Sequence, residues 1–468
     1  MQRVRERLAS RARVDAVVLG GGPGGACAAS ALARSGWSVQ VLERSRFPRY
    51  AVGESIIPYA YAVLDQLGLY DKVRSAGFQR KHGFQFVGRS GKVTPPYYFA
   101  QSMVDPRAMT WSVDRASFDH LLLEHARESG AWITEEAKVT EVLREGERVV
   151  GVRYRAADGR LHEVRARIVV DATGRGALLS RRLGLRVKDP VLDQVAAWRY
   201  VRGAHRQEGR AAGNIVIALL EPRGWFWWIP MKDDVTSVGV VAPAGHLKRL
   251  GASSLEAFHA GLASNPTLAE WTRGGEWISD CRTTGDYSYS STRFAGDGYV
   301  LVGDAAAFID PVFSTGIWLA IASGSMAAEA ADRALSRGLP AAADFRDYEV
   351  VYRRAQNTFR IFLDAFYDEN FSAGAFLRDC PEWIPEWGRV LQGDVFDDNR
   401  AFNAFLMDYR GRLARERGTE ARLLLPEGWA EDHYAPDAVR PPSPIHLGSL
   451  GVRAPARGAA AVRNTRAA

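Results

Sequence analysis

Apolar residues near the start of the chain form two short runs separated by a helical spacing. Residues 14–19 are almost entirely apolar and end in glycines, which is typical of a buried parallel strand. A helical pattern follows over residues 26–35, and a second strand pattern covers residues 37–42. A strand, a helix and a second strand in this order predict a βαβ unit.

The pattern continues with a mixture of helices and strands. A turn at Ala157-Asp158-Gly159 separates two runs that have the alternation of hairpin strands, residues 139–155 and 161–170. The other predicted elements, in chain order, are a helix at 114–130, strands of a separate sheet within 196–217 and 224–241, a short strand at 299–302, a helix from about Gly316, and an aromatic-rich helical region from Phe345 to about Leu425.

These elements predict an α/β fold. We expect a Rossmann-like nucleotide-binding domain of the βαβ type, an inserted, mostly antiparallel sheet domain and a C-terminal helical region. The expected boundaries are a basic leader at 1–13, the nucleotide-binding domain at 14–190 with strands of the sheet domain interleaved, the sheet domain at 191–290, a return to the nucleotide-binding domain at 291–344, the helical region at 345–440 and a disordered tail at 441–468.

Composition excludes several classes of protein. The chain has 468 residues, 47% of them hydrophobic, and a net charge of +7, so it can bury a large core. The basic excess is concentrated in arginines near both ends rather than on one element, and we expect no nucleic-acid partner. Its three cysteines are too few and too scattered for a disulfide scaffold or a cysteine-based metal site. No signal peptide or membrane span is apparent, and we expect a cytoplasmic protein without a metal.

A glycine-rich turn follows the first strand. Gly20, Gly22 and Gly25 satisfy GxGxxG between a strand and a helix, which lets the backbone approach a pyrophosphate at the helix N-terminus. Glu43 ends the second strand, where a carboxylate can accept the hydroxyls of a ribose. The sequence therefore predicts a dinucleotide site.

The order of motifs along residues 14–335 resembles the FAD-binding fold of aromatic hydroxylases, geranylgeranyl reductases and flavin-dependent halogenases. After GxGxxG come Asp114-Arg115, Asp171-Ala172-Thr173-Gly174 and Gly303-Asp304. The resemblance implies that the dinucleotide is FAD. It also implies the further cofactor-binding residues, which are Arg44, Ser55, Arg115, Val139, Asp304 and Ile317.

One motif within the predicted second sheet narrows this resemblance. Residues 225–230 fit WxWxIP, which resembles a signature of flavin-dependent halogenases. On a strand, Trp225 and Trp227 share one face, and Phe226 and Trp228 share the other. The two tryptophans on the first face are expected to line a cavity, although packing of a twisted sheet gives the same pattern.

Lys81 is the candidate catalytic residue. Gly53-Glu54 and Pro58 form GExxxP, and Lys81 follows before His82-Gly83, as in halogenases. Only seven of the 61 basic residues are lysines. Because the chain otherwise uses arginine, a lysine at this position indicates that an amine is required here. An amine can lose its proton or form a covalent bond, whereas an arginine side chain cannot.

The segment at the start of the predicted helix near Gly316 is a candidate halide site. Backbone N–H groups at a helix start bind anions without a charged side chain. The resemblance implies that the amides of Thr315 and Gly316 hold chloride or bromide. Tryptophan halogenases have a glutamate where this chain has Phe313, so the resemblance favours electron-rich phenols or pyrroles, free or attached to a carrier protein, over free tryptophan.

The resemblance thus implies a halogenase of natural-product biosynthesis. A separate flavin reductase would supply FADH2, and hypohalous acid made at the flavin would pass Trp225 and Trp227 to Lys81. Lys81 would hold this species by a hydrogen bond or as a haloamine. An FAD-dependent aromatic hydroxylase is the main alternative, followed by a polyprenyl reductase and a non-catalytic flavoprotein.

Overall fold

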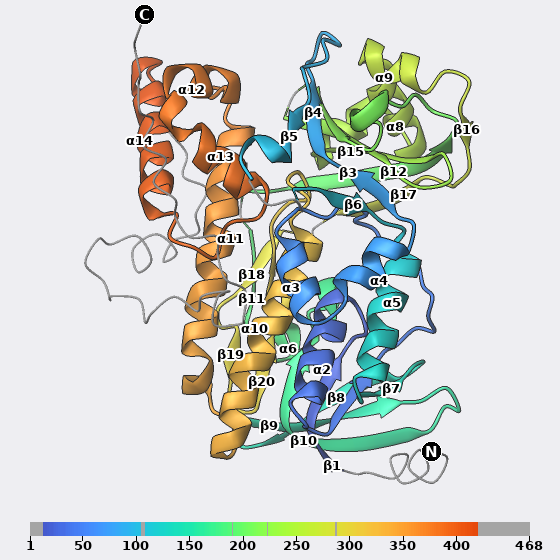
Figure 1. The fold of residues 1–468 in the computed structure, drawn as a ribbon, viewed down its shortest axis with the longest axis vertical. Helices are drawn as coiled ribbons and strands as arrows, with labels where there is room; N and C mark the ends of the chain where they lie inside the picture. The colour runs from blue at the N-terminus through green and yellow to red at the C-terminus, as the bar shows by residue number, and fades with distance from the viewer. Residues whose placement is uncertain (1–12, 104–107, 190, 222, 286–287, 420–468) are drawn as a thin grey trace, which may run out of the picture.

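The computed structural model describes residues 13–103, 108–189, 191–221, 223–285 and 288–419. The predicted tail at 441–468, nearly all of the basic leader and the last part of the helical region lie outside these residues. The described chain has two large sheets, with long helices against the first and a group of C-terminal helices beside them (Figure 1).

The first sheet contains the predicted βαβ unit. Its central strand β1 is parallel to β2 on one side and to β10 on the other. The sheet order is β19-β20-β10-β1-β2-β7, and β8 and β9 extend it from β10. The strands are β1 (Arg13–Leu19), β2 (Val39–Leu42), β7 (Trp132–Thr134), β8 (Lys138–Glu145), β9 (Arg148–Arg155), β10 (Leu161–Asp171), β19 (Ala295–Gly296) and β20 (Tyr299–Leu301).

The second sheet is antiparallel except where β4 runs parallel to β13. Its order is β16-β12-β15-β14-β13-β4-β5, with β17 also paired to β12. The strands are β4 (Gly83–Val87), β5 (Tyr97–Tyr98), β12 (Gln194–Arg202), β13 (Ile215–Leu220), β14 (Gly224–Pro230), β15 (Val235–Pro243), β16 (Glu276–Trp277) and β17 (Arg282–Gly285).

Two smaller sheets lie beside these, and helices connect the layers. The small sheets pair β3 (Gln79–Lys81) with β6 (Thr110–Ser112), and β11 (Arg186–Lys188) with β18 (Tyr289–Ser291) and β21 (Ala307–Phe308). The helices are α2 (Pro23–Arg34), α3 (Ala60–Gln66), α4 (Tyr70–Ser75), α5 (Arg115–Glu128), α6 (Leu178–Arg182), α7 (Ala244–Leu250), α8 (Ser254–Ala263), α9 (Pro266–Trp271), α10 (Gly316–Arg337), α11 (Arg346–Tyr367), α12 (Ala373–Asp379), α13 (Ile384–Leu391) and α14 (Arg400–Glu416).

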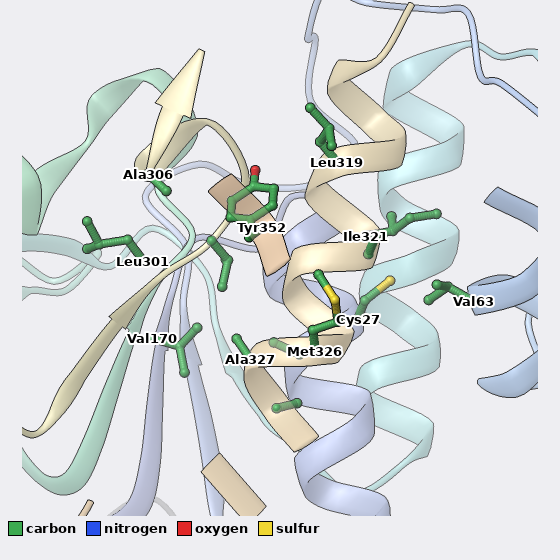
Figure 2. Packing of buried hydrophobic residues seen from close by; sticks show 14 of the residues in the cluster. Cys27, Val63, Val170, Leu301, Ala306, Leu319, Ile321, Met326, Ala327 and Tyr352 are labelled. Carbon is green, nitrogen blue, oxygen red and sulfur yellow. The ribbon is translucent and has the colours of Figure 1, made fainter. Parts of the chain in front are cut away.

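The main core lies between the first sheet and the helices α2 and α10, which pack along each other. Figure 2 shows Cys27 of α2 and Met326 of α10 in this core, with Val170 of β10 and Leu301 of β20 on the sheet side. Burial of these apolar side chains fixes the carboxyl ends of β1, β10 and β20 next to the starts of both helices.

The structure confirms the predicted fold class and corrects two element boundaries. Helix α2 begins at Pro23 rather than at residue 26, because proline is favoured at the first helical position. Residues 139–155 are two antiparallel strands, β8 and β9, rather than one. The polar pair Gly146-Glu147 makes that turn, with Gly146 in the left-handed region at φ +60°.

Candidate functional site

A cavity of about 840 Å³ extends from the glycine-rich turn to the second sheet. This volume lies within the range of small-molecule and cofactor sites. Gly25 and Lys81 are not among the lining residues. The predicted residues that line it are Gly20, Gly22, Glu43, Arg44, Ser55, Arg115, Val139, Trp225, Trp227, Asp304, Thr315, Gly316 and Ile317.

The glycine-rich turn joins β1 to α2 at one end of the cavity. Gly20 has φ +98°, and a Cβ atom there would lie 2.5 Å from the carbonyl oxygen of Ala172. Gly25 packs against the turn itself, since a Cβ atom on it would lie 2.0 Å from the Gly20 oxygen. Gly25 therefore permits the turn to close, whereas Gly20 and Gly22 face the cavity.

Glu43 ties this turn to the end of β2. Its carboxylate accepts hydrogen bonds from the Gly21 and Ser45 amides, each 2.8 Å long. A carboxylate has about four acceptor positions, and within the described residues only these two are occupied, so the group can also accept ribose hydroxyls.

Asp304 and Arg115 flank the middle of the cavity. Burial raises the pKa of Asp304 to about 6, while Arg175 and Arg115 act in the opposite direction. The Arg115 guanidinium forms a bidentate pair with Asp119 at 2.8 and 2.9 Å, and it donates to the carbonyl of Val52 at 2.7 Å. Arg115 thus holds the cavity wall in place through its partners.

These residues fit a flavin dinucleotide. The turn exposes backbone at Gly22, where only the Arg49 guanidinium would lie within 4 Å of an added Cβ atom. The start of α2 supplies amides for a pyrophosphate. Glu43 and Asp304 supply acceptors for sugar or ribityl hydroxyls further along the same cavity.

Trp225 and Trp227 line the far wall from β14. Their ring centroids are 6.1 Å apart, and both belong to one core cluster, while Phe226 and Trp228 belong to another on the opposite face. Trp227 donates to the Ser237 hydroxyl at 3.0 Å, and Trp225 donates to the Tyr367 hydroxyl at 2.9 Å. The same two tryptophans therefore pack in the core of the second sheet and line the cavity.

The start of α10 meets the cavity between Trp225 and the glycine-rich turn. Ser314 has φ +58°, and this left-handed residue turns the chain into the helix. Thr315 precedes the helix without a side-chain cap, and within the described residues no acceptor is paired with its amide or that of Gly316. The backbone at Gly316 also faces open space. This arrangement can bind an anion.

Lys81 lies behind the cavity wall, at the end of β3. The side chain is only 1% exposed, and its Nζ donates a 2.7 Å hydrogen bond to the Ser55 hydroxyl, which itself lines the cavity. The ring centroid of Phe99 is 5.5 Å from the same nitrogen. Burial lowers the pKa of Lys81 to about 7.

Asp310 of the cavity wall and its partner Tyr367 were not identified from the sequence as part of a site. Asp310 accepts from the Val312 amide and from the Tyr367 hydroxyl, each at 3.0 Å, and burial raises its pKa to about 7. Asp310 lies shortly before the predicted halide residues Thr315 and Gly316 in the chain, so this proximity could have suggested it. Tyr367 is one of many aromatic residues in its region, and it has no distinguishing sequence signal.

A second unassigned group surrounds Glu54. The Tyr200 hydroxyl donates to the Glu54 carboxylate at 2.6 Å, and the hydroxyls of Tyr200 and Tyr50 are 3.1 Å apart. Glu54 is part of the GExxxP motif, but Tyr200 is 146 residues away and no local pattern marks it.

None of the helices in the described ranges combines the length and apolar character needed to cross a bilayer. The described residues also contain no cluster of three or more histidine, cysteine and carboxylate side chains arranged for a metal ion.

Comparison with known proteins relates this arrangement to one family. The sequence model described as tryptophan halogenase matches residues 15–99 and 87–386. The chain is 32% identical over 410 residues to the chlorinase of 1H-pyrrole-2-carbonyl on a peptidyl-carrier protein from Pseudomonas fluorescens, covering 82% of this chain and 90% of that protein.

Two further relatives agree. The corresponding brominase from Pseudoalteromonas luteoviolacea is 31% identical over 324 residues, covering 69% of this chain and 78% of that protein. The structure of the myxobacterial chondrochloren halogenase, which is FAD-dependent, superposes with a TM-score of 0.73 at 34% identity, covering 86% of this chain and 91% of that one.

Proposed function

Since the chain belongs to the tryptophan halogenase family, we propose that it uses Lys81 to halogenate an electron-rich aromatic ring, of the pyrrole or phenol type, attached to a carrier protein. Membership confirms the predicted enzyme class, a flavin-dependent halogenase that uses FAD, as FADH2, and a halide. What we propose beyond this class is that Lys81 transfers the halogen and that the substrate is a carrier-bound aromatic ring.

The observation that carries the proposal is the state of Lys81. It is a buried amine whose pKa is lowered to about 7 by burial, and it is hydrogen-bonded to a side chain of the cavity wall. An amine with a pKa lowered in this way is unprotonated to a much greater extent near pH 7 than an ordinary lysine. An unprotonated amine can act as a nucleophile, which an arginine in the same place cannot do.

The chain's own residues suggest how the site is divided. The glycine-rich turn, Glu43 and Asp304 would hold reduced FAD. Together with O2, the reduced flavin would supply the chemistry that oxidises halide to hypohalous acid. The amides of Thr315 and Gly316 would hold the halide at the start of α10. Trp225 and Trp227 line the space between this helix start and the second sheet.

At Lys81 the step is a transfer of the halogen. The unprotonated Nζ takes the halogen from hypohalous acid and loses a hydrogen, so an N–halogen bond forms and water leaves. Attack by the aromatic carbon then breaks the N–halogen bond, and the ring proton returns to the amine. Ser55, which lines the cavity, accepts a hydrogen bond from Nζ and would fix its position beside the wall.

The substrate class is supported by two features. Phe313 occupies the position of the glutamate of tryptophan halogenases, and it packs against Phe362 and Phe366 at centroid distances of 6.3 and 6.0 Å. A ring that is already electron-rich needs no carboxylate at this position. Two of the relatives act on pyrrole held by a carrier protein.

A coupled assay tests the function. The enzyme, a separate flavin reductase, FAD and chloride or bromide would be incubated with pyrroles and phenols, free and carrier-bound, and products analysed by mass spectrometry. We expect a halogen isotope pattern on a carrier-bound ring. Insertion of oxygen without halogen would instead indicate the hydroxylase alternative and contradict the proposal.

Variants separate the role of Lys81 from a structural one. Lys81→Met should bind FAD and consume O2 with release of peroxide or free hypohalous acid, but it should halogenate substrate at least about 100-fold more slowly. Lys72→Met is the matched control, because Lys72 is exposed and pairs with Glu128 on the surface. Full halogenation by Lys81→Met would disprove the assigned role.

A further inference from the structure

Three residues connect the solvent-exposed edge of the cavity to its buried wall. Tyr50 is 44% exposed, and its hydroxyl lies 3.1 Å from that of Tyr200. Tyr200 in turn donates to the buried Glu54 carboxylate at 2.6 Å. Tyr50 and Glu54 both line the cavity. The result is a continuous path of hydrogen bonds from solvent to the wall.

The hydrogen bonds in this path all point the same way. The indole N–H of Trp198 donates to the Tyr50 oxygen at 2.7 Å. Tyr200 has a single hydroxyl proton, and it is directed to Glu54. The bond between the two hydroxyls must therefore be donated by Tyr50. Donors aligned in one direction are the arrangement through which a proton can pass by successive transfers.

The surroundings of the path suit a group that exchanges protons. Burial raises the pKa of the Glu54 carboxyl, while the hydrogen bond from Tyr200 lowers it. Burial also raises the pKa of Tyr50 and Tyr200, so both hydroxyls keep their protons near neutral pH. Among the described residues, charged groups that face the path include Arg115 of α5 and Arg282 of β17, whose guanidinium is 4.0 Å from the Tyr50 ring centroid.

We propose that Tyr50, Tyr200 and Glu54 form a proton relay that supplies the cavity from solvent during halogenation. The inference rests on the proposed function, because the need for a proton follows from its stoichiometry. In halogenation, the aromatic substrate R–H, a halide X⁻, O2 and FADH2 give R–X, FAD and two water molecules. This equation balances only if one proton is consumed per turnover.

Each transfer in the relay conserves its hydrogens. Tyr200 gives its hydroxyl proton to the Glu54 carboxylate, takes the proton of Tyr50, and Tyr50 takes one from a solvent hydronium ion. The protonated Glu54 then releases its proton into the cavity, and the hydroxyls rotate back. Neither tyrosine is oxidised, and no other reactant is required.

The first test uses the protein without cofactor. Infrared difference spectra across pH would follow the carboxyl band of Glu54, assigned by its loss in Glu54→Gln. In Tyr200→Phe the carboxylate loses a donor that stabilises its charged form, so its pKa should rise further. Tyr409→Phe is the control, because this buried tyrosine also donates to a carboxylate, Asp379, but lies in α14. A Glu54 band that does not respond to Tyr200→Phe would overturn the relay.

The second test follows protons during a single turnover. FADH2-loaded enzyme would be mixed with O2, bromide and a carrier-bound pyrrole in the presence of an indicator dye. We expect proton uptake and flavin reoxidation to slow together by about 10-fold or more in Tyr200→Phe and Glu54→Gln, with a larger solvent deuterium effect. Proton uptake that is as fast in Tyr200→Phe as in the control Tyr409→Phe would also overturn the relay.

The two tests distinguish the relay from the function on which it rests. Hydroxylation of the ring consumes no net proton, so an absence of uptake in the parent enzyme, with an oxygenated product, would overturn the halogenase proposal. The infrared response of Glu54 does not depend on the reaction, and it decides whether the hydrogen-bonded path exists in either case.

Discussion

Lys81 combines a sequence signal and a structural one. Its rarity among the basic residues identified it as a candidate, but the chain alone did not indicate that it is buried beneath Ser55 rather than on the cavity wall. Pairing of β3 with β6, where Lys81 lies opposite Thr110, places the side chain there. The low dielectric of this position accounts for the lowered pKa.

The burial of Lys81 predicts a pH-dependent cost to stability. Between pH 7 and 10.5 the unfolded amine binds a proton that the folded amine does not, so this group makes stability rise with pH. Lys81→Met removes the penalty, and near pH 7 it should raise the free energy of unfolding by about 2–4 kcal/mol. Urea unfolding at pH 7 and 9 would show the difference shrinking at the higher pH. A pH-independent difference would contradict this account.

Trp227 depends on the absence of a side chain on the neighbouring strand. Gly239 of β15 lies opposite Trp227 in the register, and a Cβ atom on it would lie 2.1 Å from the indole ring. The indole ring lies over Gly239. Because Gly239 has no side chain, the ring can lie along the sheet and line the cavity.

We therefore expect Gly239→Ala to displace the Trp227 ring. The clash should lower the free energy of unfolding by about 1–3 kcal/mol and change the halide-dependent activity, because the cavity wall moves. Thermal melts and tryptophan fluorescence measure both changes. Gly245→Ala is the control, since a Cβ atom there meets only the Arg249 side chain at 3.7 Å; equal effects of the two variants would contradict the role of Gly239.

At the scale of elements, the start of α10 depends on one left-handed residue. Ser314 has φ +58° directly before Thr315 and Gly316. Thr315 and Gly316, which follow this residue directly, both line the cavity. The candidate halide site is thus a property of backbone shape rather than of a charged side chain.

Two substitutions of Ser314 test this dependence. Ser314→Val places a β-branched residue in the left-handed region, at a cost of about 1–2 kcal/mol, and should raise the KM for chloride as the turn relaxes. Ser314→Gly should keep the parental KM, because glycine adopts this φ freely. Halide-dependent product formation gives both values. A raised KM in the glycine variant as well would point to the serine hydroxyl instead.

Helix α11 joins two parts of the cavity that lie far apart in the chain. The hydroxyl of Tyr367 at its end accepts from Trp225 and donates to Asp310. One side chain therefore contacts both the WxWxIP strand and the segment that leads to the candidate halide site. This contact explains why the C-terminal helices belong to the site as well as to the core.

At the scale of the molecule, net charge bears on the proposed carrier partner rather than on the fold. A charge of +7 favours association with an acidic carrier protein. We expect affinity for a carrier-bound substrate to fall as ionic strength rises above about 0.1 M, where surface charges are screened. Because a halide is a substrate, sodium sulfate should set the ionic strength at a fixed halide concentration. Affinity that does not respond to salt would exclude electrostatic docking.

The sequence by itself determined the features that depend on local pattern. Strand alternation placed Trp225 and Trp227 on one face, and the spacing after β1 identified the turn at Gly20 and Gly22 that faces the cavity. Local spacing suffices for these because neighbouring residues fix both the backbone conformation and the face that is buried.

Only the tertiary structure decided which distant side chains meet. The contact of Tyr200 with Glu54, the support of Trp225 by Tyr367 and the space that Gly239 leaves each join segments whose proximity depends on strand register and helix packing. The pKa of Lys81 belongs to the same group, since the surrounding side chains exclude water from it. Long-range packing sets these properties, and no local spacing encodes it.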